Sequence, residues 1–508
     1  MRKFSLFGLA ILIVVSMLLA GCTSESTQKP NTSAPKETEK ENENQGKESA
    51  EPMEIEIAQS GTGFPDPDPI AEALNEALGI KLKINALASS EDYFNQLNVR
   101  LAAGNYPDII LTQDRQRMAE YARKGMLLDL TPYRDKLQPV VDFVGEDNFK
   151  KGFLDGQQVG IPRIPDVPFS TWWVRKDWLD NLGLEAPTNL DEIVEVAKAF
   201  TFDDPDQNGK NDTYAMTGGG LSAFLGIFSA YGVGQPGNFY VKDGEVINSL
   251  YDPAMKDALA KIKELIDLGV VDPELIANTA RQHIDKMYKG QFGLVYHPWT
   301  DIAKTEAQEQ IKMVNPDAEW LQIKAPTGPG GNLDGVYDVA TVSRLWSLPK
   351  SMENDPEKLD KILELFNYVS EREGNLLVMY GIEGKNFDLK GDTVEITDPK
   401  GVEHSHYYQM TGRPNAEYLA VKFGYAQKEI DFAIEQPRVE IYDSLVTLPD
   451  GYVSTDAERY ISEEMIKFVY GNRSLDEYDD FLKTLETTFN YKVYLDAATE
   501  QITEFINQ

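Results

Sequence analysis

The sequence is poor in the residues that support thiol, metal and nucleic-acid chemistry. It contains one cysteine and four histidines among 508 residues. This excludes a disulfide framework, CxxC redox chemistry and a cysteine-based zinc site, and it argues against a histidine-rich metal centre. Basic residues number only 49 against 83 acidic ones, which gives a net charge of −34. A chain this negative repels phosphates, so no nucleic-acid partner is expected.

Long apolar runs are also lacking, with one exception at the N-terminus. Arg2 and Lys3 precede a nearly uninterrupted apolar stretch over residues 4–20, and this region ends in Leu19-Ala20-Gly21-Cys22. The stretch is short for a membrane span and has the form of a signal peptide. The last four residues resemble a bacterial lipobox. We therefore expect cleavage before Cys22 and attachment to that thiol of diacylglycerol, which carries fatty acyl chains such as palmitate; the alternative is an ordinary N-terminal anchor.

Residues 23–52 are rich in Ser, Thr, Glu, Lys, Asn and Pro and almost free of large apolar side chains. Such a segment buries too little surface to offset its ordering entropy, so it is predicted to be a disordered tether. A lipid-anchored body on the extracytoplasmic face of the cell membrane has no access to cytosolic ATP or NAD. No organic cofactor is therefore expected.

From Met53 onward the pattern is α/β. Residues 53–57 and 82–84 alternate as strands do, 108–111 is a short apolar strand, and helices are predicted over 69–78 and 91–103. Strands and helices that alternate at this spacing predict a parallel sheet with crossover helices. Later helices begin near Leu190, Pro253 and Pro356, and the last 50 residues look almost entirely helical. The length exceeds what one core usually serves, so at least two lobes are expected.

Several phrases, in order along the chain, resemble the extracytoplasmic solute-binding proteins of ABC importers, in particular the maltose-binding and alginate-binding proteins of family 1. They are Tyr106-Pro107-Asp108-Ile109-Ile110, Asp114-Arg115, Gly125 to Pro132, Gly160-Ile161-Pro162, Val174 to Leu179, Asp204 to Tyr214 and Tyr380 to Lys385. The resemblance covers most of residues 53–508.

This resemblance implies a two-lobed α/β fold of periplasmic-binding-protein type II, with three hinge crossovers and a helical C-terminus. We expect lobe 1 at 53–165 and 328–385, and lobe 2 at 166–327 and 386–508. The implied function is capture of an oligosaccharide or related carbohydrate between the lobes, by a monomer that delivers it to a membrane permease. No enzymatic activity is implied.

A sugar site needs aromatic platforms and groups that form planar hydrogen bonds. Asp114 and Arg115 follow the strand at 108–111, where side chains face a crevice, and they match a sugar-binding Asp-Arg pair of the family; the alternative for Asp114 is a helix N-cap. Trp299, in His297-Pro298-Trp299, resembles a family tryptophan that stacks on sugar, and His297 replaces the usual glycine. Trp299→Ala is then expected to weaken binding with little effect on folding.

Other candidates are less specific. Trp172 and Trp173 are adjacent in an extended segment, so strand geometry directs them to opposite faces and at most one reaches a cleft. Tyr231 is a further platform candidate, and Arg163 with Asp166 lies at the first crossover. Simple packing is the alternative for each aromatic residue. Trp178 is expected in the core, and Trp346 is left open.

The sharpest chemical motif is the acidic loop Asp204, Asp206, Asn208, Gly209, Lys210 and Asp212. Oxygen ligands at positions 1, 3, 5 and 9, a carbonyl at 7 and a turn glycine at 6 suit a structural Ca²⁺. Position 12 is Ala215, so the bidentate Glu is missing; the alternative is a solvated turn. His404 and His406 with Glu403 form a weaker metal candidate, for which a surface pair is the simpler interpretation.

Two other functions remain open from the sequence. A cell-surface glycoside hydrolase would need two carboxylates roughly 5–9.5 Å apart, and no catalytic signature identifies such a pair. A peptide-binding lipoprotein would need a polar cleft rather than aromatic platforms.

Overall fold

The computed structural model describes residues 51–61, 64–279, 281–342, 344–399 and 406–507. Residues from Pro52 onward form one compact unit. The predicted signal peptide, Cys22, most of the predicted tether, Glu403 and His404 lie outside the described residues. Within those ranges, no helix combines the length and the apolar character needed to cross a bilayer.

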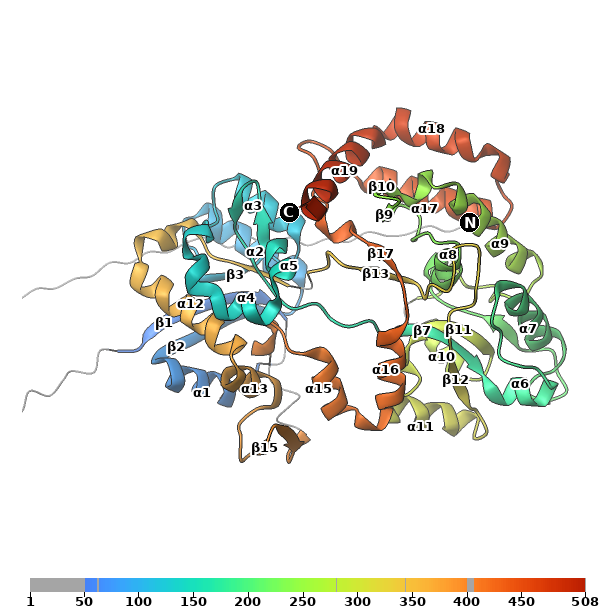
Figure 1. The fold of residues 1–508 in the computed structure, drawn as a ribbon, viewed down its shortest axis with the longest axis horizontal. Coiled ribbons are helices and arrows are strands. Elements are labelled where there is room, and N and C mark those ends of the chain that lie inside the picture. Colours follow the sequence, from blue (N-terminus) through green and yellow to red (C-terminus); the bar gives the residue numbers. More distant parts are fainter. Residues whose placement is uncertain (1–50, 62–63, 280, 343, 400–405, 508) are drawn as a thin grey trace, which may run out of the picture. The chain divides into compact units, whose positions relative to one another are not determined.

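The first lobe is built on a mixed sheet of five strands (Figure 1). Its order is β2 (Ile80–Leu87), β1 (Met53–Ser60), β3 (Ile109–Leu111), β14 (Leu345–Ser347) and β6 (Ile161–Pro162). β1 pairs in parallel with β2 and β3, as the alternating pattern predicts, whereas β14 runs antiparallel to β3. β14 returns from a later part of the chain and lies between β3 and β6, so the sheet is completed only after the chain has visited the second lobe.

Helices surround this sheet and bury their apolar faces in one core. The predicted helix over 69–78 has the expected ends, because Asp68 caps its N-terminus and Gly79 adopts the left-handed conformation at φ 63°. The helices of this lobe are α1 (Pro69–Leu78), α2 (Ser90–Ala102), α3 (Arg115–Arg123), α4 (Gln138–Val144), α5 (Glu146–Phe149), α12 (Pro356–Ser370) and α13 (Arg372–Tyr380). A short hairpin joins β4 (Phe153–Leu154) to β5 (Gln157–Gln158).

The second lobe has its own four-stranded sheet and its own core. The order is β12 (Trp320–Ile323), β7 (Ser170–Arg175), β11 (Phe292–Pro298) and β8 (Tyr214–Met216). Around it lie α6 (Lys176–Leu182), α7 (Leu190–Phe202), α8 (Leu225–Ala230), α9 (Pro253–Asp267), α10 (Gln282–Tyr288) and α11 (Thr305–Val314). The N-cap of α7 is Asn189, and the backbone N–H and hydroxyl of the preceding Thr188 donate to Glu192.

A second four-stranded sheet and five helices complete this half of the molecule. The sheet order is β10 (Glu245–Asn248), β9 (Phe239–Lys242), β17 (Val439–Ile441) and β13 (Val336–Asp338). The helices are α15 (Asn415–Lys422), α16 (Gln427–Glu435), α17 (Thr455–Val469), α18 (Tyr478–Phe489) and α19 (Tyr491–Asn507). The predicted helical C-terminus is confirmed. A hairpin of β15 (Phe387–Lys390) and β16 (Thr393–Ile396) extends from α13.

The chain passes between the two cores three times, as expected, and the crossings touch one another. Ile164 N donates to Thr411 O at 2.9 Å, and Arg163 N donates to Arg344 O at 3.1 Å. The second and third crossings come later than the expected boundaries. Residues 328–335 still pack on the second lobe, where Gly330 N donates to Ala230 O at 2.8 Å, and residues 407–410 still belong to the first core.

Candidate functional site

The first two candidates lie where β3 leads into α3, and the structure gives them different roles. Asp114 is the N-cap of α3, since its Oδ1 accepts the Arg117 N–H at 2.8 Å. Arg115 extends from the helix and donates from Nη1 to the carbonyl of Lys151 at 2.7 Å. Its Nε is buried and has no hydrogen-bond partner among the described residues. Arg115 therefore keeps unused donor capacity, whereas Asp114 is committed to the helix.

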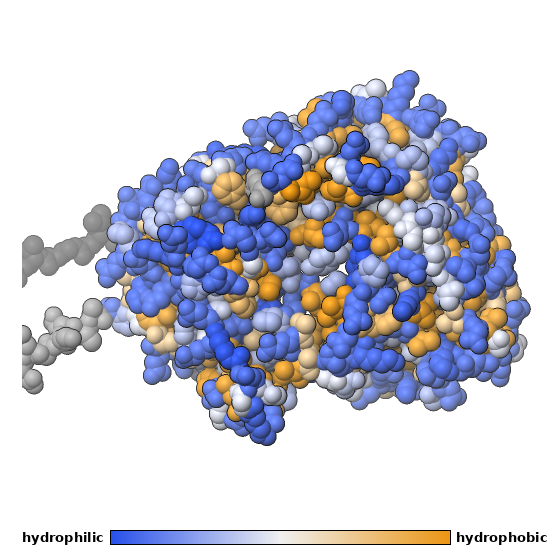
Figure 2. All heavy atoms as spheres, in the orientation of Figure 1, coloured by the Kyte–Doolittle hydropathy of each residue, from blue (hydrophilic) through white to orange (hydrophobic). Residues whose placement is uncertain are grey.

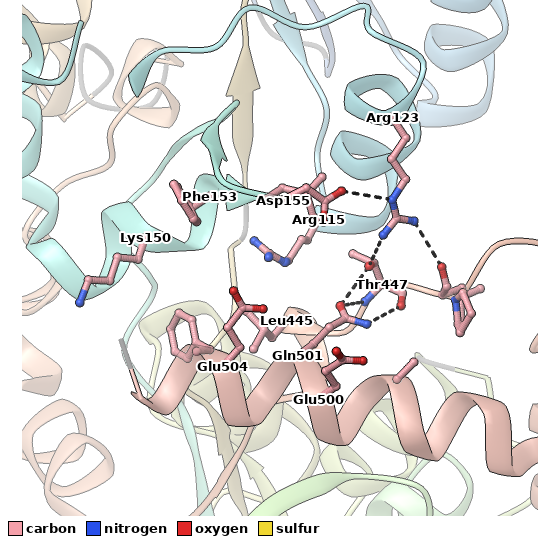
Figure 3. Close-up of a pocket in the computed structure, with 15 residues that line it drawn as sticks. Arg115, Arg123, Lys150, Phe153, Asp155, Leu445, Thr447, Glu500, Gln501 and Glu504 are labelled. Carbon is pink, nitrogen blue, oxygen red and sulfur yellow. Dashed lines mark hydrogen bonds and ion pairs between the residues drawn. The ribbon is translucent and has the colours of Figure 1, made fainter. Parts of the chain in front are cut away.

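Arg115 lines a cavity of about 310 Å³ between the first lobe and the C-terminal helix (Figure 3). One wall comes from α3 and the β4–β5 hairpin, and the other from α19 and residues 445–449. We call this cavity the α3–α19 hollow. Its lining combines aromatic rings, guanidinium groups, carboxylates and an amide: Phe153, Phe505, Arg115, Arg123, Asp155, Glu500, Gln501 and Glu504. These are the groups that bind the ring faces and hydroxyls of a polar solute.

The two arginines of the hollow differ in their commitments. Burial lowers the pKa of Arg115 to about 10, against the opposing effect of the Asp155 and Glu504 carboxylates, so it stays charged at neutral pH. The Nε atom of Arg123 lies 3.6 Å from Asp155 Oδ2, and its Nη2 donates to Thr447 Oγ1 at 3.3 Å. Arg115 is thus the guanidinium better placed to bind a guest.

Behind this wall, Lys151 connects the first lobe to the second crossing. Its side chain is only 3% exposed. Its Nζ donates to Thr341 O at 3.2 Å. Burial lowers the pKa of Lys151 to about 8, which the charge of Asp338 partly offsets.

The candidate Arg163 lies at the junction of the first and third crossings. It is buried, forms an ion pair with Asp166 and donates to the Gln409 side chain. Asn415 Nδ2 donates to Asp166 Oδ1 at 2.8 Å. In this arrangement Arg163 and Asp166 hold two crossings together, and any contact of theirs with a solute stays a prediction.

The tryptophan candidates are placed in the core, unlike the platforms that the sequence predicts. Trp172 and Trp173 do point to opposite faces of β7, but they are 0% and 2% exposed and enter two different cores. Trp299 is 0% exposed, with its ring centroid 6.1 Å from Phe169 and 5.5 Å from Phe423. The segment after α15 brings Phe423 over Trp299. In this arrangement none of the three presents an open ring face, and any stacking of theirs on a solute stays a prediction.

The remaining candidates lie elsewhere in the molecule. His297 Nε2 is 3.1 Å from Asp301 Oδ2 at the end of β11, and its ring lies 5.3 Å from that of His283. Tyr231 lines a second hollow of about 590 Å³, together with Arg438 and Tyr442 among others. Trp346, left open from the sequence, is buried in the first lobe and donates to Gln409 O at 2.9 Å.

The acidic loop is closed by its own hydrogen bonds. Asp204 accepts the backbone N–H groups of Asn208 and Gly209, both at 3.0 Å. Asn208 Nδ2 donates to Asp206 Oδ2 at 2.9 Å and to Asp212 Oδ1 at 3.0 Å. Lys210 N donates to the Asn208 Oδ1 that the motif offers as a ligand. Over the described ranges, no three His, Cys, Asp or Glu side chains are arranged to hold a metal ion.

This loop nevertheless has the chemistry of a cation site. Burial raises the pKa of Asp206, and the neighbouring carboxylates Asp204 and Asp212 add to the rise. A bound cation would relieve this repulsion, and the Asn208 amide now occupies the space between two of the acids. The donor set therefore fits a hard cation once that amide turns its oxygen inward.

Sequence reasoning missed the whole α19 side of the hollow, namely Thr447, Glu500, Gln501, Glu504 and Phe505. Thr447 lies in a loop, and the other four belong to a segment whose pattern shows only an amphipathic helix. They meet Arg115 through tertiary packing, so no local signal could have identified them.

Relatives in sequence include a lipoprotein and two carbohydrate-binding proteins. The chain is 25% identical to "Lipoprotein LipO" of Bacillus subtilis, over 92% of each protein. It is 26% identical to the polygalacturonan/rhamnogalacturonan-binding protein YtcQ of the same organism, over 80% of this chain and 78% of YtcQ. It is 22% identical to the fructooligosaccharide ABC transporter substrate-binding protein FusA of Streptococcus pneumoniae, over 78% and 80%.

Solved structures share the fold. The alginate-binding protein AlgQ2, solved without calcium ion, superposes with a TM-score of 0.66 at 18% identity, over 90% of this chain and 99% of AlgQ2. An HMO-binding solute-binding protein from Bifidobacterium longum infantis gives 0.68 at 18% identity, over 89% and 98%. The family model of the bacterial extracellular solute-binding proteins matches residues 63–375, more than half of the chain. The chain therefore belongs to the bacterial extracellular solute-binding protein family.

Proposed function

We propose that this protein is a lipid-anchored, extracytoplasmic receptor that captures an oligosaccharide and delivers it to the permease of an ABC importer. The observation that carries the proposal is the α3–α19 hollow, where two separately packed halves present aromatic rings and hydrogen-bonding groups to one space. The names of YtcQ and FusA, which bind or import carbohydrate, support the same ligand class.

Capture requires no bond to be made or broken. A ligand that contacts Arg115 on the first lobe and α19 on the other half stabilises the arrangement in which both walls are close. The three crossings allow the halves to move about a short, hydrogen-bonded hinge. The permease can then recognise the closed form, which the protein would present as a monomer.

A glycan screen tests this function. The protein is titrated with oligosaccharides in a thermal-shift assay, followed by calorimetry. A ligand at a hundredfold its Kd should stabilise the protein by about 2.7 kcal/mol, and the sugar should be recovered intact. Recovery of cleaved sugar would instead support the hydrolase alternative, and a response to peptides alone would support the peptide-binding one.

The lipid anchor is proposed from Cys22 and has its own test. In a bacterial host fed labelled palmitate, the wild-type protein should carry the label and sediment with membranes. Cys22→Ala should lose the label and leave the membrane fraction. An unlabelled wild-type protein would contradict the anchor without affecting ligand binding.

We also propose that the acidic loop holds a structural Ca²⁺. Asp204, Asp206, Asn208 and Asp212 would supply side-chain oxygens and Lys210 its backbone carbonyl. The positive charge of the ion would offset the repulsion among the three neighbouring carboxylates. Adding Ca²⁺ should raise the melting temperature, EGTA should reverse the rise, and Asp206→Asn should abolish both effects. An unchanged melting temperature would count against the ion.

A further inference from the structure

The charges around the α3–α19 hollow are divided between its walls. The first-lobe wall carries Arg115, Arg123 and Lys150, and the helix wall carries Glu500 and Glu504. Figure 3 shows Arg115 and Glu504 extending from opposite walls toward the same space. With Asp155 on the first-lobe side, the lining holds three cations and three anions. The hollow is thus charge-balanced as a whole although the protein is strongly acidic.

Most of the positive charge is already compensated. Arg123 is engaged with Asp155 and lies 3.8 Å from Asp450, and Lys150 lies 3.7 Å from Asp147. Arg115 makes no ion pair shorter than 4 Å within the described ranges, and its Nε has no partner there. An incoming anion would therefore meet one available cation, Arg115, with the helix carboxylates facing it.

A hydroxyl group suits this arrangement better than a carboxylate does. Each hydroxyl can accept a hydrogen bond from the Arg115 guanidinium and donate one to a carboxylate on α19. A ligand carboxylate has no proton to donate, and the negative charges of Glu500 and Glu504 would repel it. Phe153 and Phe505 can cover the apolar face of a sugar ring.

We infer that the hollow selects an uncharged, hydroxyl-rich glycan over a uronate-containing one, with Arg115 and the Glu500–Glu504 face binding the same hydroxyl groups from opposite sides. This inference rests on the proposed function and specifies the substrate class. A zwitterionic peptide would also match the opposed charges, but it lacks the paired hydroxyls and apolar ring face that these walls fit.

The test compares ligand classes across matched variants. Calorimetry at physiological salt measures the affinity of the full chain for neutral gluco-, galacto- and fructo-oligosaccharides, for galacturonate and mannuronate oligomers, and for zwitterionic tripeptides. The variants are Arg115→Gln and the double variant Glu500→Gln/Glu504→Gln. The control is Asp496→Asn, which removes one acid from the same helix outside the hollow, where Asp496 is 65% exposed. Melting temperatures establish that each variant is folded.

The wild type should bind a neutral oligosaccharide more tightly than a uronate oligomer of the same length. Arg115→Gln should weaken neutral binding by roughly tenfold, the loss of one charge-assisted hydrogen-bonded contact. Glu500→Gln/Glu504→Gln should shift the uronate-to-neutral affinity ratio by about tenfold in favour of the uronate. Asp496→Asn should leave that ratio within twofold.

The possible failures are distinguishable. Tighter wild-type binding of uronates, or an equal ratio in Glu500→Gln/Glu504→Gln and Asp496→Asn, would overturn the inference and leave the carbohydrate receptor in place. If Arg115→Gln leaves the affinity for neutral oligosaccharides unchanged, the ligand binds outside this hollow, and the inference is overturned as well. Binding of peptides with no glycan bound would overturn both the inference and the proposed function.

Discussion

The Gln501 side chain of α19 pairs with Thr447 through three hydrogen bonds. Gln501 Oε1 accepts the Thr447 backbone N–H at 2.9 Å and its hydroxyl at 3.0 Å, and Gln501 Nε2 donates to Thr447 O at 2.9 Å. The next residue, Leu448, donates its N–H to Gln116 Oε1 of the first lobe at 2.7 Å. The amide group of Gln501 thus fixes the loop at residues 445–449, which contacts both α19 and α3 beside the hollow (Figure 3).

Gln501→Ala should therefore destabilise the protein by about 2 kcal/mol, because Thr447 is 1% exposed and its N–H would lose its partner. Urea denaturation measures the change. Gln427→Ala on α16 is the control, since the Gln427 side chain donates to Asp431 in an exposed hydrogen bond, and we expect a change within about 0.5 kcal/mol. Equal effects in the two variants would show that the three-bond pairing adds nothing.

Trp299→Ala should unfold the protein more readily rather than act only on binding. A fully buried tryptophan packed against Phe169 and Phe423 leaves a large cavity on truncation, and such changes cost about 3–5 kcal/mol. Thermal denaturation compares it with Tyr425→Ala, in which the aromatic residue lost is 58% exposed. A fully stable Trp299→Ala protein with weakened glycan binding would instead restore the stacking role predicted from the sequence.

Gly412→Ala should disturb the contact between the first and third crossings. Gly412 has φ 100°, and an added Cβ would lie 2.2 Å from Ile164 Cγ2. Gly384→Ala is the matched control, because Gly384 has φ 77° and open space around it. The control should lose about 1 kcal/mol from backbone strain alone and Gly412→Ala clearly more. Denaturant midpoints measure the loss of stability in each variant. Equal losses in Gly412→Ala and Gly384→Ala would mean that the crossings accommodate the methyl group.

Asp334 should make stability depend on pH. The side chain is 0% exposed, both oxygens lack a hydrogen-bond partner within the described residues, and burial raises its pKa to about 7 against the opposing charge of Arg438. The unfolded value is about 3.9. Between these values the folded state binds more protons, so this group's contribution to stability falls as pH rises from about 4 to 7 and is lowest above 7.

Asp334→Asn removes that titration. Relative to wild type, the variant should gain stability progressively over this window, by on the order of 2–4 kcal/mol above pH 7. Urea unfolding at several pH values measures the difference, and Asp496→Asn supplies the response of an exposed carboxylate. Parallel pH profiles for wild type and Asp334→Asn would show that Asp334 is ionised at little cost.

The fold was largely readable from the sequence because its signals are local. The alternation over residues 53–57, the end of α1 at Gly79 and the start of α9 at Pro253 each depend on residues within a few positions of one another. The capping box of Ser474 and Glu477 is present for the same reason. The positions of the second and third crossings were less readable, because contacts between distant segments decide where the chain leaves a core.

The sequence by itself determined the α/β class, the approximate bounds of several helices and strands, the acidic charge, and the order of phrases that identifies the family. Tertiary structure decided which candidates have open surface. In the folded chain Trp299 is buried under Phe423, and Asp114 caps α3. Arg115 lies close to α19, which begins more than 370 residues later in the sequence. Backbone periodicity records which face of an element is apolar, but not which distant segment covers that face. Burial, and with it the binding role of each side chain, therefore follows only from the packed chain.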